Sequence, residues 1–541
     1  MIPSNPINLI MSGAYISNEL IAEFGPLPPA FLPLGVGRLY DKQISCLKQD
    51  TKEVIPIYIT LPESFEIPCH DLQYLKEKGV TPIFIPDGLE LGEAIVLAIN
   101  SISAYSSSIR ILHGDTVLNR LPNGLDVAAA HPEKDDYCWA AINHTNNQID
   151  NFELIEAATE RNLDRSVACG YFAFSSCSEL VRAMVRARYD FIKGLNLYNK
   201  RYSMKMEYVE DWYDFGHLQT YFHSRRMVST SRAFNSLQIT DSEVKKYSTD
   251  HFKMEAEAHW FANLPPSLLP YSARLLDKGT EGSRTFYTTE YQYTPNLSEL
   301  FVFSEIGKVT WKKILNSSVS FLETCNKYRG EKPRDHYMNM LMGSKTISRL
   351  EKYAEETGFN IEKSLQFNGR NTPSLLKIAE SLQTMISENS EEFSTIMHGD
   401  FCFSNILYNS RNSRISVIDP RGYVADKYLD IYGDIRYDIA KYSHSINGLY
   451  DLIIAGRYSL NQDNDYSFSI EFEKSQQRDW LKKIFSELII ANIPTNSLEI
   501  QAITIALFLS MLPLHADRPD RQAAYIANAL RLFSNLESTN K

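Results

Sequence analysis

One stretch near residue 400 constrains the chain more than any other. A His-Gly-Asp sequence ending at Asp400 follows an apolar run at 394–397, and Asn405 comes five residues after the aspartate. A second apolar run at 415–418 leads directly into Asp419. Phosphoryl transfer requires a carboxylate beside the attacking hydroxyl, and an amide oxygen and a carboxylate on Mg²⁺. The pattern therefore predicts Asp400 as the catalytic base and Asn405 and Asp419 as ligands of Mg²⁺. The alternative is a β-hairpin whose aspartates and asparagine only cap turns.

This stretch resembles the catalytic segment of the aminoglycoside phosphotransferase and choline kinase family, in which His-Gly-Asp replaces the His-Arg-Asp of protein kinases. The two aspartates and the asparagine stand in the order that kinase catalytic loops use. The resemblance implies a bilobal, protein-kinase-like α+β domain over about 229–541. It also implies ATP and Mg²⁺ as cofactors and the hydroxyl group of a small molecule as the acceptor.

Length and composition narrow the class further. A chain of 541 residues predicts two or three domains, and a charged share of 22% is ordinary for globular protein. The net charge of −11, without a basic tract interleaved with aromatics, argues against a nucleic-acid partner. We find no signal peptide and no apolar run of the roughly 18 residues that a membrane span needs. Seven scattered cysteines without a Cys-x-x-Cys pair are typical of the reducing cytoplasm. We expect a cytoplasmic protein, whose oligomeric state stays open, a homo-oligomer included.

The first two hundred residues alternate strand-like and helix-like patterns. Apolar strands are predicted at 8–11, 54–60, 81–85 and 108–112, with helices between them. This alternation is typical of a doubly wound α/β sheet, in which ligands bind at the carboxyl ends of the strands. Asp115 follows the last of these strands.

Several motifs in this region resemble those of sugar-phosphate nucleotidyltransferases. The strand, the Gly-containing loop and the Pro-x-Ala-Phe-Leu-Pro-Leu-Gly sequence are similar to the opening of that family. The sequence at 112–115 looks like its Gly-Asp metal site, that at 168–174 like its Gly-x-Tyr-x-Phe strand, and that at 212–216 like its Trp-x-Asp-x-Gly turn. The resemblance implies a GT-A or Rossmann-like domain over 1–228. In it, Asp115 and Asp214 would hold Mg²⁺ on a second nucleoside triphosphate, CTP or UTP.

The same region departs from the family in its cations. Pro29 stands where the family has a catalytic lysine, and 161–167 offers no counterpart of the second lysine. Without these cations a phosphate cradle stabilises developing charge poorly. Arg38 or Lys42 could take their place. The alternative is a domain kept for substrate binding, kinase regulation or assembly.

Residues 229–300 resemble the small lobe of a kinase, with strands predicted at 232–239, 242–247 and 284–291 and a helix at 250–264. A strand lysine must reach the ATP phosphates, and a helix glutamate must hold it. Neighbouring strand residues face opposite sides, so only one of the adjacent lysines can point inward. We favour Lys246 over Lys245, and Glu257 over Glu255 as its partner.

Glu290 and Tyr291 end an apolar strand and look like the hinge that binds adenine through its backbone. The rest of the chain, about 301–541, is expected to form the large lobe. It is predicted to be helical over 311–390, with breaks at 329–333, 358 and 368–373, and over 465–536. The resemblance gives Asp438 a structural role, bracing the catalytic loop. His444 is interpreted as a core histidine.

These patterns together predict an ATP-dependent kinase acting on a sugar, polyol or amino-alcohol hydroxyl, fused to a nucleotidyltransferase-like domain. Such a fusion implies an activated precursor for capsule or other surface polysaccharide, an inference that rests on domain pairing alone. Two alternatives stay open. The first domain could bind ligand or regulate without catalysing, or the whole chain could be a non-catalytic capsule-assembly protein.

Overall fold

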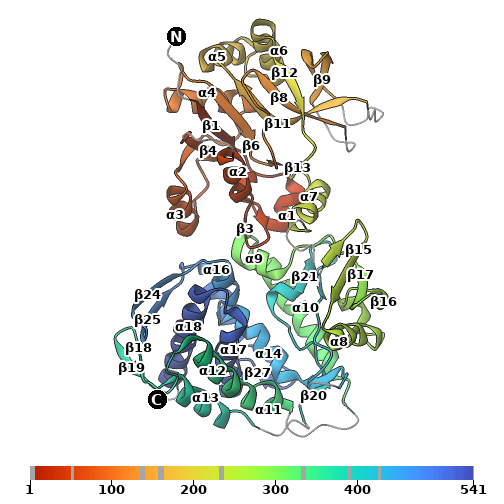
Figure 1. Ribbon diagram of the computed structural model, residues 1–541, viewed down its shortest axis with the longest axis vertical. Helices are drawn as coiled ribbons and strands as arrows, with labels where there is room; N and C mark the ends of the chain where they lie inside the picture. The colour runs from red at the N-terminus through yellow and green to blue at the C-terminus, as the bar shows by residue number, and fades with distance from the viewer. Residues whose placement is uncertain are drawn as a thin grey trace. The chain divides into compact units, whose positions relative to one another are not determined.

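The computed structural model describes eight stretches of the chain: residues 6–49, 54–133, 140–155, 164–230, 237–330, 337–387, 392–424 and 428–539. The chain divides into two compact units. One contains Met1–Ser229 with Phe303–Glu305, and the other contains Thr230–Val302 with Ile306–Lys541. Each unit combines helices with β-sheet, so the fold is mixed α/β (Figure 1).

The N-terminal unit is built on a nine-stranded sheet with the order β5-β4-β1-β6-β11-β8-β12-β10-β9. Strands β5, β4, β1 and β6 are parallel, as the alternating pattern predicted. All five residues of β1 are buried because helices cover a parallel sheet on both faces. The strands in chain order are β1 (Ile7–Met11), β4 (Ile57–Pro62), β5 (Val80–Ile85), β6 (Ile109–His113), β8 (Val127–Pro132), β9 (Ala140–Thr145), β10 (Gln148–Leu154), β11 (Ser166–Phe174) and β12 (Lys205–Tyr208).

Helices of this unit supply the apolar side chains that bury the sheet. Ile95 and Leu180 are fully buried in the same core cluster as the strand residues Leu9 and Phe172. The principal helices are α2 (Leu39–Lys48), α3 (Cys69–Glu77), α4 (Leu91–Ser101), α5 (Cys177–Arg186), α6 (Phe191–Tyr202) and α7 (Leu218–Thr230). A small separate ladder joins β7 (Thr116–Leu118) to β13 (Trp212–Asp214), and it brings two distant parts of the chain together beside the end of β6.

The small lobe of the C-terminal unit is a four-stranded antiparallel sheet with one helix against it. Its elements are β14 (Leu237–Ile239), β15 (Glu243–Ser248), α8 (His251–Ala262), β16 (Leu275–Glu281) and β17 (Arg284–Glu290). The register of β15 and β17 sets Lys246 opposite Tyr287. Strand β16 was not predicted, and residues 232–236 of the first predicted strand lie outside the described residues.

The large lobe is mainly helical. Its main helices are α10 (Lys308–Asn326), α12 (Gly343–Thr357), α13 (Leu375–Thr384), α14 (Ile435–Ile446), α17 (Leu498–Ser510) and α18 (Pro519–Thr539). Asp434 is the N-cap residue of helix α14, and its side chain accepts a hydrogen bond from the Arg436 amide at 3.0 Å. The catalytic stretch lies between β20 (Ser394–Ile396) and the hairpin of β21 (Ile406–Asn409) and β22 (Arg414–Val417).

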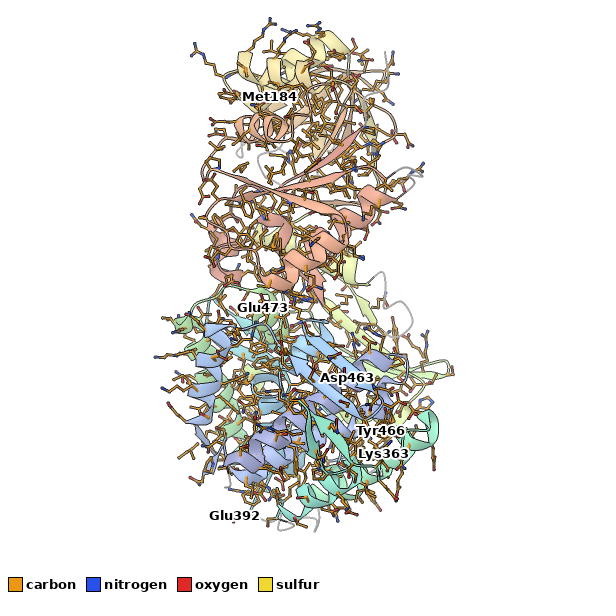
Figure 2. The ribbon with its side chains drawn as sticks, turned by 90° about the vertical axis from the view of Figure 1, so that its left-hand side faces the viewer. Met184, Lys363, Glu392, Asp463, Tyr466 and Glu473 are labelled. Carbon is orange, nitrogen blue, oxygen red and sulfur yellow. The ribbon has the colours of Figure 1, made fainter. Side chains whose placement is uncertain are left out.

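The helical prediction for 311–390 and 465–536 is wrong at two places, one of which is the short hairpin of β26 (Ile489–Ile490) and β27 (Ile493–Pro494). A four-stranded sheet forms from β19 (Arg370–Thr372), β18 (Leu365–Phe367), β25 (Ser467–Glu471) and β24 (Ser459–Asn464). Figure 2 shows Lys363 and Tyr466 beside this sheet, where the Lys363 Nζ lies 3.9 Å from the centre of the Tyr466 ring. Among the described helices, none is both long enough and apolar enough to span a membrane.

Candidate active site

The backbone of the predicted catalytic loop is held from behind by Asp438 on α14. One carboxylate oxygen of Asp438 accepts from the His398 amide at 2.6 Å, and the other accepts from the Gly399 amide at 2.8 Å. Gly399 has a φ of +81°, and a Cβ there would lie 2.5 Å from the Cβ of Arg421. Only glycine fits this backbone conformation next to that neighbour. These bonds are the bracing contact that the sequence predicted for Asp438.

His398 connects the loop to the strand that carries Asp419. Burial lowers the pKa of His398 to about 4, so the imidazole is neutral. Its Nε2 then donates to the Ile418 carbonyl at 3.0 Å, and its Nδ1 accepts from the Asp400 amide at 3.2 Å. A neutral histidine satisfies both partners, and it fixes the distance between the two functional aspartates.

The Asp400 carboxylate is held by two groups from different elements. Lys441 on α14 lies 2.9 Å from its Oδ1, and the Asn405 side-chain amide donates to its Oδ2 at 2.9 Å. Burial raises the pKa of Asp400, but the Lys441 ammonium outweighs it and holds the pKa below its ordinary value. Asp400 is therefore a carboxylate at neutral pH, in the state that a general base requires.

Sequence reasoning missed Lys441. The one available signal was its position three residues after Asp438 on the same helix, which puts both side chains on one face. Asp438 holds the loop backbone from that face, and Lys441 holds the loop's carboxylate.

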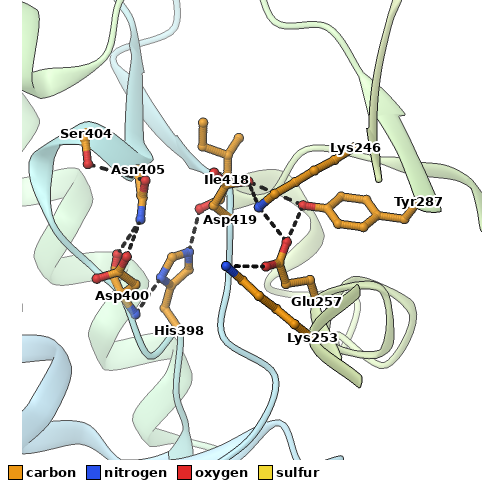
Figure 3. Close-up of polar contacts among 10 residues, drawn as sticks. All are labelled: Lys246, Lys253, Glu257, Tyr287, His398, Asp400, Ser404, Asn405, Ile418 and Asp419. Atoms are coloured by element: carbon orange, nitrogen blue, oxygen red, sulfur yellow. Dashed lines mark hydrogen bonds and ion pairs between the residues drawn. The ribbon is translucent and has the colours of Figure 1, made fainter. Parts of the chain in front are cut away.

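A second cluster joins the small lobe to Asp419 (Figure 3). The Lys246 Nζ lies 2.7 Å from Glu257 Oε2 and 3.1 Å from Asp419 Oδ1. Tyr287 donates to the same glutamate oxygen at 2.8 Å, and sequence reasoning missed this residue. Burial lowers the pKa of Lys246, but Asp419 and Glu257 more than offset it, so the ammonium stays charged. Burial raises the pKa of Glu257.

The structure also separates Lys246 from its neighbour. Lys245 points to the other face of the sheet, where it pairs with Glu281 at 2.6 Å and lies over the ring of Phe286. Of the two adjacent lysines, Lys246 is thus the one that reaches the helix glutamate. The sequence preference for Glu257 over the exposed Glu255 agrees with this pairing.

Both clusters line one cavity of about 480 Å³. Asp419 and Asn405 suit Mg²⁺, because Mg²⁺ takes one or two protein oxygens and keeps several waters. The Asn405 side-chain nitrogen is directed at Asp400, so its Oδ1 is the group left for a metal, and the Asp419 side chain is 46% exposed. Among the described residues, no group of three or more histidine, cysteine, aspartate or glutamate side chains is arranged to hold a metal ion.

The predicted hinge residues do not line this cavity. The Glu290 amide donates to the Arg274 carbonyl at 3.0 Å, and the Tyr291 amide donates to the Ser242 carbonyl at 2.7 Å. An adenine bound here would need other backbone groups of the segment. The adenine-binding role of Glu290 and Tyr291 stays a prediction.

In the N-terminal unit, Asp115 and Asp214 converge on Gly216. A methyl group placed on Gly216 would lie 2.8 Å from Asp115 Oδ2 and 3.5 Å from Asp214 Oδ1. The ladder of β7 and β13 and a bond of 2.8 Å from the Phe215 amide to the Asp115 carbonyl bring them together. Two carboxylates that converge on one point suit a divalent cation, which offsets their mutual repulsion.

Gln43 on α2, which sequence reasoning missed, holds the loop that carries Asp115. Its side-chain amide donates to the carbonyls of His113, Gly114 and Thr116 at 3.1, 3.0 and 2.9 Å.

A cavity of about 340 Å³ opens beside Asp115, and Pro29 lines it. Among the described residues that form its wall, none is a lysine or an arginine. Arg38 cannot supply the missing charge, contrary to the sequence expectation. It is buried, lies 3.0 Å from Asp71 and donates to two backbone carbonyls. Lys42 does not line the cavity either.

No family model and no curated protein matches the sequence. Solved structures similar to parts of the chain include HddC from Yersinia pseudotuberculosis, at 14% identity and a TM-score of 0.29, covering 41% of this chain and 99% of HddC. They also include a thermostable mutant of aminoglycoside phosphotransferase APH(4)-Ia, at 12% identity and a TM-score of 0.31, covering 58% and 99% of the two chains. An aminoglycoside-3′-phosphotransferase of type VIII is 12% identical, with a TM-score of 0.29 and coverage of 51% and 99%. With TM-scores near 0.3 these likenesses do not bear on function, which must come from the site itself.

Proposed function

We propose that the C-terminal unit transfers the γ-phosphoryl group of ATP to the hydroxyl of a small molecule. One observation carries the proposal. Lys246, Glu257 and Asp419 form one ion-paired cluster, and Asp400, Asn405 and Lys441 form another in the same cavity. Phosphoryl transfer needs a positively charged side chain that binds the phosphates, and beside it an ionised carboxylate that is held in place to act on the acceptor hydroxyl.

Each residue has a separate task in this proposal. Asp400 orients the acceptor hydroxyl and takes its proton, and Lys441 keeps Asp400 ionised. Lys246 binds the ATP phosphates, with Glu257 and Tyr287 fixing its position. Asn405 and Asp419 would hold Mg²⁺, which when bound neutralises charge on the phosphates.

The test is the replacement Asp400→Ala. ATP consumption is screened against sugars, polyols, choline and ethanolamine, and products are identified by mass spectrometry. A positioned base contributes on the order of 10²–10⁴ in rate, so we expect a loss of that size with Mg·ATP binding retained. Turnover near that of the wild type in the variant would remove Asp400 from the mechanism.

For the N-terminal unit we propose binding of a nucleotide or a phosphorylated small molecule at Asp115 and Asp214 through Mg²⁺. Domain pairing suggests that such a unit converts the kinase product into a nucleotide-activated precursor of surface polysaccharide. The cavity wall, in which no described residue is a lysine or an arginine, favours the alternative of a unit that binds without catalysing. Pyrophosphate release, measured with the kinase product and each nucleoside triphosphate, separates the two: release supports transfer, and binding without release supports the alternative.

A further inference from the structure

The large-lobe side of the kinase cavity carries two guanidinium groups without a carboxylate partner. Arg349 lies on α12, and Arg421 follows Asp419 closely in sequence; both line the cavity. Within the described ranges neither forms an ion pair. The catalytic-loop carboxylates of the cavity form ion pairs with lysines instead of with these arginines. Asp400 pairs with Lys441, and Asp419 pairs with Lys246. Arg421 acts on Asp400 at longer range, where its charge lowers the pKa of that carboxyl, but neither arginine is neutralised by a direct ion pair among the described residues.

The Arg349 guanidinium uses one of its N–H donors for a hydrogen bond to the backbone. Its Nη1 donates to the Ser510 carbonyl at 2.9 Å. Ser510 is the last residue of α17, where helix carbonyls attract cations. A guanidinium has five N–H donors, and this is the one hydrogen bond of the side chain within the described residues. The remaining donors are free to bind a ligand.

Arg421 is held close to the same place by aromatic rings. Its guanidinium carbon lies 4.8 Å from the ring centre of Tyr423 and 6.0 Å from that of Tyr437. Burial lowers the pKa of Arg349, and the positive charge of Arg421 lowers it further, so the two guanidiniums lie near enough to repel each other. Both guanidiniums line the same cavity, and an anion bound between these like charges relieves their repulsion.

The ATP phosphates do not account for this charge. They would be met by Lys246 and Lys253, which belong to the small lobe. Helix α12 instead packs against α17 and against the turn Leu512–His515, which belong to the large lobe (Figure 1). Arg349 thus lies on the side of the cavity that is left for the acceptor. Arg421 lies between the lobes, because the neighbouring Tyr423 packs against Phe252 of α8.

We infer that the acceptor bears, besides its hydroxyl, a carboxylate or phosphate group that Arg349 and Arg421 bind. Guanidinium groups bind both anions through paired, charge-assisted hydrogen bonds. The same two charges repel an amine, so an amino-alcohol acceptor is disfavoured. The inference rests on the proposed kinase function for the hydroxyl, but the anion site can be tested without turnover.

The experiment uses the full chain saturated with Mg²⁺ and a non-hydrolysable ATP analogue, so that the phosphate-binding lysines are occupied. Glucose 6-phosphate, glucuronate, glucose and glucosamine are titrated calorimetrically, with inorganic phosphate as a competitor. We expect an anionic member to bind at least about 10-fold more tightly than glucose, and glucosamine to bind no better than glucose, because hydrogen bonds to charged groups contribute about 1.5–3 kcal/mol. Comparing the affinities for glucose 6-phosphate and glucuronate shows whether the site prefers a phosphate or a carboxylate.

The variant Arg349→Gln should weaken binding of the anionic probe by about 10- to 100-fold, and Arg349→Lys by less. Arg411→Gln removes the same charge from an exposed turn outside the cavity and should change nothing. Thermal melting confirms that each variant is folded. Equal affinities for glucose and both anionic probes, or anion binding indifferent to Arg349, overturn the inference. Anion binding that depends on Arg349, without ATP turnover on any acceptor, keeps the anion site and rejects the kinase proposal.

Discussion

Replacing Lys441 with methionine should move the pH dependence of the kinase rather than simply lower its rate. Lys441 is the main positive charge on Asp400, at 2.9 Å, and its side chain is only 13% exposed. Methionine preserves most of the side-chain volume and removes the charge. Asp400 would then lose the group that holds its pKa below the ordinary value.

The size of the effect follows from the contact. A hydrogen bond to a charged group contributes about 1.5–3 kcal/mol, which corresponds to about 1–2 pKa units. The Asp400 side chain is 41% exposed, so solvent screens the pair and the lower end applies. We expect the acid limb of the kcat/KM profile to shift upward by about one pH unit.

The assay measures kcat/KM against pH with the acceptor that the screen identifies. Lys441→Arg keeps the charge and should leave the acid limb near its original position. Lys312→Met removes a charge from the exposed face of α10 and controls for net charge. A uniform loss of rate at every pH, with the acid limb in place, would show that Lys441 acts only through packing.

Three further predictions concern the other carboxylates. Asp419→Asn should weaken Mg·ATP binding more than Asp400→Asn does, because Asp419 contacts Lys246 and is the expected metal ligand; equal calorimetric affinities contradict this division. Burial raises the pKa of Asp438 to about 7, above its value of roughly 3.9 in the unfolded chain. Between these two pH values the folded state keeps a proton that the unfolded chain loses. The free energy of unfolding therefore falls as pH rises from about 4 to about 7. Asp438→Asn removes this component, and denaturant unfolding at a series of pH values should give a flatter dependence; an unchanged slope argues against the raised pKa. Asp115→Asn should abolish Mg²⁺-dependent nucleotide binding by the N-terminal unit while Asp211→Asn retains it, and equal binding in the two variants would leave Asp115 without a metal role.

The parts of the site that were predictable are those that a short segment determines. Asp400 and Asn405 meet because a single tight turn joins them, so their short separation in the sequence was enough to place both in one predicted site. The preference for Lys246 over its neighbour followed from the alternation of side chains along a strand. These features depend on the geometry of a turn and of a strand, which can be predicted from neighbouring residues in the sequence.

The parts that were missed depend on distant elements or on weak local patterns. Tyr287 reaches Glu257 only because β17 pairs with β15 in one particular register. Arg38 carries no sequence mark that distinguishes a buried structural arginine from a phosphate-binding one; its burial against Asp71 emerges only from packing. Strand β24 was missed because Ser459–Asn464 is mostly polar and lacks the alternation that marks a half-buried strand.

The two cavities differ in how they can bind a polyphosphate. Six lysine and arginine side chains line the kinase cavity, whereas the described wall of the N-terminal cavity has none. Phosphate charge can be balanced by side-chain cations, by metal ions or by backbone N–H groups, and among the described residues of the N-terminal cavity wall Asp115 could hold such a metal ion. The charge distribution therefore supports the proposals of phosphoryl transfer at the C-terminal unit and of metal-dependent ligand binding at the N-terminal unit.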